Sequence, residues 1–154
     1  MKTIMKRPYA ILMAIVCLVS VFSSCKESFT SSYTYVATSQ NAFPLDPTSQ
    51  AIAQAIIDYQ TKAGILGTPF NKSVDKEKLT DEELNELDKE ATEDVTARLG
   101  ACNFAQIVKE AGITVPDKQP VIYIHYVVGW PDITGGSVVE RGKTTLEIMP
   151  ETLK

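Results

Sequence analysis

The sequence predicts an α+β fold, in which a small and mostly antiparallel sheet of three or four strands has helices packed on one face. Two periodicities lead to this prediction. Near both ends of the chain, β-branched and aromatic residues alternate or form a short apolar run, which is typical of strands. In between, apolar residues recur every three or four positions, which is typical of helices. The resulting order is strand, helix, helix, strand, strand.

Composition limits the class of protein. The chain has 154 residues, of which 44% are apolar and 22% charged, and these values describe one ordinary globular domain. It is too short for an α/β barrel, which needs about 250 residues. A net charge of -4 and a pI near 5.0 argue against a nucleic-acid-binding protein.

The first predicted strand covers residues 33–38, where aromatic and β-branched residues follow a period of two. Residues 41–47 contain two prolines and predict a loop. Thr48 or Ser49 can cap the helix that follows, and Gly64 stands where a C-cap glycine belongs.

A loop at residues 65–74 separates this helix from the next. Thr80 and Glu83 form a capping box, so the second helix begins there. Its apolar pattern continues for about 31 residues, which is longer than a typical globular helix, so we expect a bend or break near Gly100.

The strongest strand pattern covers residues 121–128, whose two faces are both largely apolar, and such a strand is expected at the centre of its sheet. Residues 129–136 predict a loop. Residues 138–139 and 144–149 predict either one strand kinked at Arg141-Gly142 or two short strands.

The N-terminal segment has the layout of a secretory signal. Lys2, Lys6 and Arg7 form a basic start, and an apolar run follows at residues 9–22. This run is shorter than the roughly 20 residues that cross a bilayer. We therefore expect a cleaved leader and not a membrane-spanning helix.

Ser23-Ser24-Cys25 closes this leader with two small residues directly before a cysteine. The segment resembles the lipobox of bacterial lipoproteins, although Phe22 stands where most members have leucine. The resemblance implies that the chain is cut before Cys25 and that acyl chains on Cys25 hold it in a membrane.

The residues after the cysteine, Cys25-Lys26-Glu27-Ser28, partly resemble the export tag of Bacteroidota lipoproteins shown on the cell surface. Together the two resemblances imply an outer-membrane location. The chain then divides into a signal peptide at residues 1–24, a lipidated cysteine with a flexible tether at residues 25–32, and a single domain at residues 33–154.

His125 is the only histidine, and by alternation it shares a strand face with Tyr123. Catalytic triads and zinc sites need further groups around a histidine, and no spacing here matches a metal motif. The sequence favours a structural role, with partner contact through Tyr123 and His125 or a small hydrolase site as alternatives.

Trp130, the only tryptophan, lies in the predicted loop with Asp132 close behind it. Loops often carry recognition residues, and an exposed indole can stack on a sugar or anchor a protein. The alternative is that Trp130 closes one end of the core, because tryptophan buries a large area.

The second helix begins with a dense group of acids, which predicts a solvated face that could steer a basic partner. The spacing matches no calcium-binding loop, and we expect no metal and no cofactor. These acids are Asp81, Glu82, Glu83, Glu86, Asp88, Glu90, Glu93 and Asp94.

These observations favour a lipid-anchored binding or accessory module, acting through protein contacts in an outer-membrane complex. The alternatives are a glycan-binding module using Trp130 and a small hydrolase using His125. The sequence contains no catalytic constellation that would favour an enzyme.

Intact-mass analysis of the protein from its native host tests the anchor. We expect a chain that starts at Cys25 and carries the added mass of acyl groups, because two or more acyl chains are needed for durable anchoring. An uncut leader, or an unmodified thiol at residue 25, would contradict the prediction.

Overall fold

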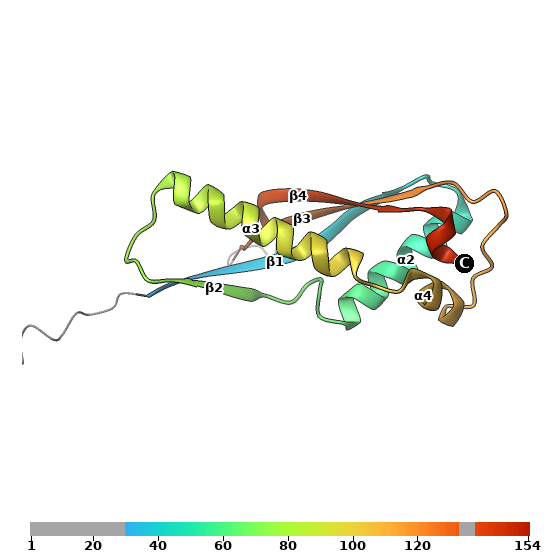
Figure 1. Cartoon of the computed structure of the whole chain (residues 1–154), viewed down its shortest axis with the longest axis horizontal. Helices are drawn as coiled ribbons and strands as arrows, with labels where there is room; N and C mark the ends of the chain where they lie inside the picture. The colour runs from blue at the N-terminus through green and yellow to red at the C-terminus, as the bar shows by residue number, and fades with distance from the viewer. Residues whose placement is uncertain (1–29, 133–137) are drawn as a thin grey trace, which may run out of the picture.

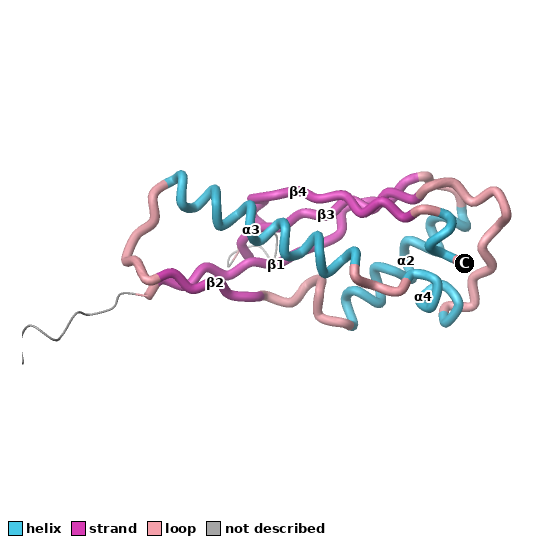
Figure 2. Tube along the Cα trace, in the orientation of Figure 1, coloured by secondary structure: helices cyan, strands magenta, loops and turns pink. Residues whose placement is uncertain are grey.

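The computed structural model describes residues 30–132 and 138–154, so the predicted leader and Cys25 lie outside the described residues. Figures 1 and 2 show an elongated molecule whose C-terminus lies at the end opposite the start of the first strand. Its elements are β1 (Ser31–Phe43), α2 (Pro47–Lys62), β2 (Phe70–Val74), α3 (Asp81–Gly100), α4 (Phe104–Glu110), β3 (Ile122–Pro131), β4 (Val138–Ile148) and the 3-10 helix η1 (Pro150–Leu153).

The four strands form one antiparallel sheet in the order β2-β1-β3-β4, which confirms the α+β fold class. β1 is long enough to serve two partners, because residues 31–35 pair with β2 and residues 36–43 pair with β3. β3 therefore lies between β1 and β4, and its predicted central position is confirmed.

Three segments predicted as loops are wholly or partly strands. Residues 70–74 form β2, residues 41–43 complete β1, and residues 129–131 complete β3. Their local sequences are polar or contain glycine and proline, which gives weak strand signals. Pairing with a neighbouring strand satisfies their backbone groups, and β2 thereby adds a strand between the first two helices.

The N-cap of α2 is Asp46, which stands two residues before Thr48, the earlier of the two predicted caps. The carboxylate of Asp46, and not Thr48 or Ser49, caps the helix by accepting a hydrogen bond from Ser49 N at 3.0 Å. Ser49 is fully buried and its hydroxyl instead accepts a hydrogen bond from Gln119 Nε2 at 2.8 Å. Gly64 follows the helix with a φ of 72°, a conformation that favours glycine.

The capping box of α3 and the predicted break near its end are both confirmed. Glu83 N donates to Thr80 Oγ1 at 3.3 Å, and Thr80 N donates to Glu83 Oε2 at 3.0 Å. α3 ends at Gly100. Asn103 then caps α4 by accepting a hydrogen bond from Gln106 N at 3.1 Å, so the long apolar pattern is divided between two helices.

The helices pack on one face of the sheet, as predicted, and α3 lies mainly against β4 and β3. Tyr126 projects from β3 into this core, where its hydroxyl donates to Gln60 Oε1 of α2 at 2.8 Å. Each fully buried aliphatic side chain contributes about 1.5 to 3 kcal/mol. The largest of the buried core side chains are Tyr35, Tyr126, Ile52, Ile56, Leu99, Ile122, Ile124 and Ile148.

β4 is one strand with an irregularity where the kink was predicted. Val128 pairs with Gly142 whereas Gly129 pairs with Glu140, so Arg141 is an extra residue on β4. This arrangement is a β-bulge, which bends a strand and redirects a side chain. The backbones of β3 and β4 approach closely beside the bulge, at Gly129 and Val139.

Two alanine substitutions test the role of this close approach. A Cβ at Gly129 would lie 1.9 Å from Val139 O, so Gly129→Ala must displace backbone and should lower the free energy of unfolding by about 1 to 3 kcal/mol. Gly100 has open space around it, so Gly100→Ala should stabilise α3 by about 0.5 to 1 kcal/mol. Urea denaturation measures both, and shifts of the same sign would contradict this account.

Candidate functional site

One face of the sheet carries no helix, and we call it the helix-free face. Ile122, Ile124 and Tyr126 of β3 point into the core, so the alternate residues of this strand point the other way. Residues paired across strands share a face, which extends the surface to β1 and β4. The helix-free face includes Phe43, Tyr123, His125, Lys143, Thr145 and Glu147, together with Val36 and Val127, which are buried.

The structure places Tyr123 and His125 together on this face. Tyr123 lies opposite Phe43 of β1, and these two rings are 39% and 41% exposed. The His125 ring meets Phe43 edge to face, with 5.8 Å between ring centroids. Its Nδ1 lies 2.8 Å from Thr145 Oγ1, so a hydroxyl contacts the imidazole, and the hydrolase hypothesis stays a prediction.

Trp130 lies on the opposite, helix-covered face, away from Tyr123 and His125. It belongs to β3 and not to a loop, because it pairs with Val139 of β4. Its ring packs against the core, and the guanidinium of Arg141 lies 4.5 Å from the ring centroid. Arg141 therefore occupies one face of the indole that a sugar would need.

Asp132 directly follows β3 and is half-buried. The remainder of the predicted recognition loop, residues 133–136, lies outside the described residues. The structure therefore separates the predicted site residues into two groups, with Tyr123 and His125 on one face of the sheet and Trp130 on the other.

Most of the acids of α3 lie on its solvent side, and several of them form surface ion pairs. Lys72 lowers the pKa of Glu90, and Lys76 lowers the pKa of Glu83. Such exposed pairs contribute little stability, which fits the interpretation of a solvated face. The pairs are Lys72–Glu90 at 2.8 Å, Lys76–Glu83, Lys89–Glu93 at 3.8 Å and Arg98–Asp94 at 2.9 Å.

Asp88 is the exception, because it points inward and is only 6% exposed. Its Oδ2 accepts from Arg141 Nε at 2.9 Å and lies 2.7 Å from Arg141 Nη2, while Oδ1 accepts from Tyr35 OH at 3.4 Å. Burial, together with the charge of Asp88, raises the pKa of Tyr35, although Trp130 and Arg141 act in the opposite direction. The phenol therefore stays protonated and donates to the carboxylate.

This cluster was not predicted, although the sequence of α3 contains a signal for it. Asp88 stands four residues after Leu84 and three before Ala91, so it interrupts the apolar stripe of α3. A charged residue on such a stripe needs a buried counter-charge. Only the sheet pairing shows that Arg141 supplies it.

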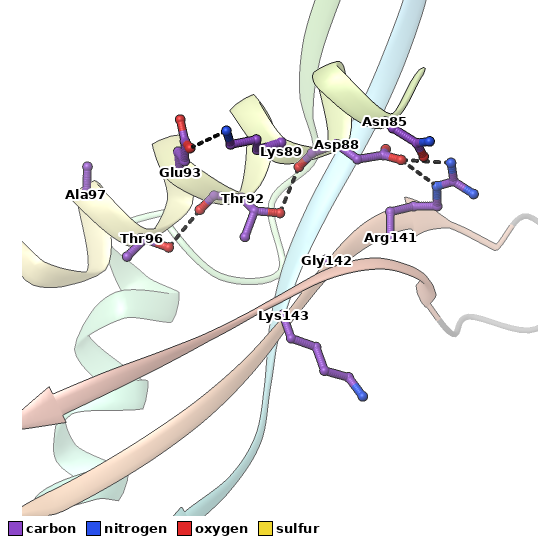
Figure 3. Close-up of a pocket in the computed structure, with 10 residues that line it drawn as sticks. All are labelled: Asn85, Asp88, Lys89, Thr92, Glu93, Thr96, Ala97, Arg141, Gly142 and Lys143. Atoms are coloured by element: carbon purple, nitrogen blue, oxygen red, sulfur yellow. Dashed lines mark hydrogen bonds and ion pairs between the residues drawn. The ribbon is translucent and has the colours of Figure 1, made fainter. Parts of the chain in front are cut away.

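A groove of about 550 Å³ opens between α3 and β4 beside this cluster. Figure 3 shows Arg141 directed towards Asp88, whereas Lys143 points away from the helix. Small groups bring the helix close to the strand, because a Cβ at Gly142 would lie only 2.1 Å from Thr92 Oγ1. Asp88 and Arg141 neutralise each other beside the groove, so this cluster acts as a joint between α3 and β4.

Cys102 is half-buried after α3, and its Sγ lies 3.8 Å from Arg98 O. Burial raises the pKa of this thiol, with Gln60 acting in the opposite direction, so the thiol stays protonated at neutral pH. Among residues 30–132 and 138–154, no group of three or more His, Cys, Asp or Glu side chains could hold a metal ion.

Comparison with family models, characterised proteins and solved structures finds no match to this chain. In the part of the chain that the structure describes, no helix is long and apolar enough to cross a membrane.

Removing the guanidinium tests the joint. Arg141→Ala leaves Asp88, whose side chain is 7% exposed, without its counter-charge, and should cost about 3 kcal/mol of the free energy of unfolding. Lys89→Ala breaks an exposed pair on the same helix and should cost less than about 1 kcal/mol. Urea denaturation compares the two variants.

A second substitution separates charge from packing. Adding Asp88→Asn to the Arg141→Ala protein removes the uncompensated charge and should recover part of the lost stability. Equal costs for Arg141→Ala and Lys89→Ala would show that the buried pair does not hold α3 to β4.

Proposed function

We propose that this chain is a binding module of the cell envelope, anchored in the outer membrane by a lipid on Cys25. It contacts a protein partner of the same membrane through the helix-free face. The observation that carries this proposal is the pair of exposed aromatic side chains, Phe43 and Tyr123, which lie opposite each other on adjacent strands.

An antiparallel sheet with one covered face usually presents polar residues on the other. Here the helix-free face presents two large rings beside His125. Aromatic side chains are enriched at the centre of protein interfaces, where they supply much of the binding energy. Thr145 and Glu147 add hydrogen-bonding groups at the border of these rings, as in the polar rim of an interface.

The predicted anchor would hold the domain, by the Ser31 end of β1, close to the bilayer. Only residues 26–30 separate Cys25 from β1, and such a segment spans at most about 18 Å when fully extended. A tether this short confines the domain to the neighbourhood of the membrane surface. It thereby raises the effective concentration of the domain for membrane proteins nearby, so a modest interface suffices.

Co-purification from the native host tests the proposal. A tagged chain extracted in mild detergent should retain its partner. The double variant Phe43→Ala/Tyr123→Ala should reduce that retention at least tenfold, because each aromatic side chain removed from the centre of an interface costs more than about 1 kcal/mol of binding free energy. Quantitative mass spectrometry measures the ratio of partner to chain.

Val139→Ala is the matched control, because Val139 is 48% exposed but lies on the helix-covered side of the sheet opposite Trp130. This variant should retain the partner. Retention of the partner by the double variant, or equal loss in the control, would exclude the helix-free face as the binding surface.

A further inference from the structure

β4 lies at one edge of the sheet, and among the described strands only β3 pairs with it (Figure 1). The outer edge of such a strand presents backbone N–H and C=O groups that another strand can pair. The register with β3 is continuous from Gly142 to Ile148, and the bulge at Arg141 ends this regular run. The regular run of β4 is therefore residues 142–148.

The charges along this run are arranged symmetrically. Thr145 stands at its centre, with Lys143 two residues before it and Glu147 two residues after it. All three point to the helix-free face, because they pair with alternate residues of β3. The side chain of Lys143 is 63% exposed, and Glu147 is also exposed.

We propose that a second copy of this chain pairs with β4 in antiparallel fashion, about a two-fold axis at Thr145. This register sets Thr145 opposite its own copy and sets Lys143 of each chain opposite the partner's Glu147. Side chains directly opposite in an antiparallel pair have Cβ atoms about 4.5 to 5.5 Å apart, which suits an ion pair. Both copies then contribute one lysine and one glutamate to two equivalent pairs.

Neighbouring registers fit less well. In an antiparallel pair, residues opposite each other point to the same face of the sheet. When the helices of both copies lie on one side of the joined sheet, the two-fold axis therefore passes through a residue and not between two residues. An axis at Lys143 sets two lysines opposite each other. An axis at Thr144 sets Lys143 opposite Thr145, and an axis at Leu146 sets Glu147 opposite Thr145. Only the axis at Thr145 uses the whole regular run and pairs both charges.

The contacts within the chain permit this exchange. Lys143 Nζ lies 3.1 Å from Glu140 Oε1, but this pair is exposed and weak, so the lysine can take a new partner. The opposite edge of the sheet is less suitable, because β2 has 5 residues and its Lys72 is already paired with Glu90. The favoured interface joins two sheets of four strands into one of eight, and it does not depend on lipid anchoring.

Charge reversal tests the interface. The full chain with Cys17, Cys25 and Cys102 replaced by serine is measured in detergent by light scattering with the detergent mass subtracted. It should form dimers, and Lys143→Glu or Glu147→Lys alone should weaken dimerisation about tenfold or more, because each sets like charges opposite twice. The double variant Lys143→Glu/Glu147→Lys should restore it.

Glu86→Lys is the matched control for Glu147→Lys, since it makes the same charge change at an exposed position of α3. It should leave dimerisation unchanged. Circular dichroism verifies that each variant is folded. A monomer at all concentrations, or a dimer that the single reversals do not weaken, would overturn the proposal.

Cysteine cross-linking tests the register itself. In the same serine background, Thr145→Cys should form a disulfide-linked dimer under a mild oxidant, because the two thiols meet at the axis. Glu147→Cys should not, because the two copies of residue 147 lie four positions apart along the strands, about 13 Å. Equal cross-linking of the two variants would exclude this register.

Discussion

A buried carboxylate controls how α3 meets the sheet. Asp88 is almost inaccessible to water, and an uncompensated charge in such a place would cost several kcal/mol. Arg141 compensates it, and can do so because the bulge in β4 turns an extra residue towards the helix. With the pair formed, Thr92 lies close against Gly142, so a glycine is needed in the strand below the helix. One ion pair thus sets the spacing between helix and sheet.

The same pair contributes to the difference between the two faces of the sheet. Arg141 also lies over the ring of Trp130, so the indole becomes part of the packed side of the domain. Two aromatic side chains of the sheet stay accessible on the other side, where Phe43 and Tyr123 flank His125. For a module that recognises a partner, this side offers the larger accessible aromatic surface. The groove beside α3 is lined mainly by polar and charged side chains, with no aromatic residue among those described, and its Asp88–Arg141 pair is already neutral.

The bulge has a second effect, because it divides β4 into an irregular part and a regular one. Before Arg141 the strand bends, which makes edge pairing difficult. After it, seven residues follow an unbroken register with β3. Three of them point to the helix-free face, and these are charged, uncharged and charged in turn. A lysine on an edge strand commonly discourages pairing. Here a glutamate at the symmetric position offsets that effect for one partner, a second copy of the same strand.

Local signals in the sequence determined the helices and the faces of β3. The capping box at Thr80, the break after Gly100 and the glycine that follows α2 depend on hydrogen bonds and backbone angles within a few residues, so they are readable without a fold. Alternation along β3 likewise placed Tyr123 and His125 on one side. The kink at Arg141 was also visible as an arginine and a glycine within a strand pattern.

Only the tertiary structure decided which elements touch. β2 exists because β1 extends far enough to pair with it, and its own residues carry a weak strand signal. The Asp88–Arg141 pair joins residues 53 positions apart, and the side of the sheet that holds Trp130 depends on pairing with Val139. Register and long-range contact are properties of two segments together, so neither segment encodes them alone.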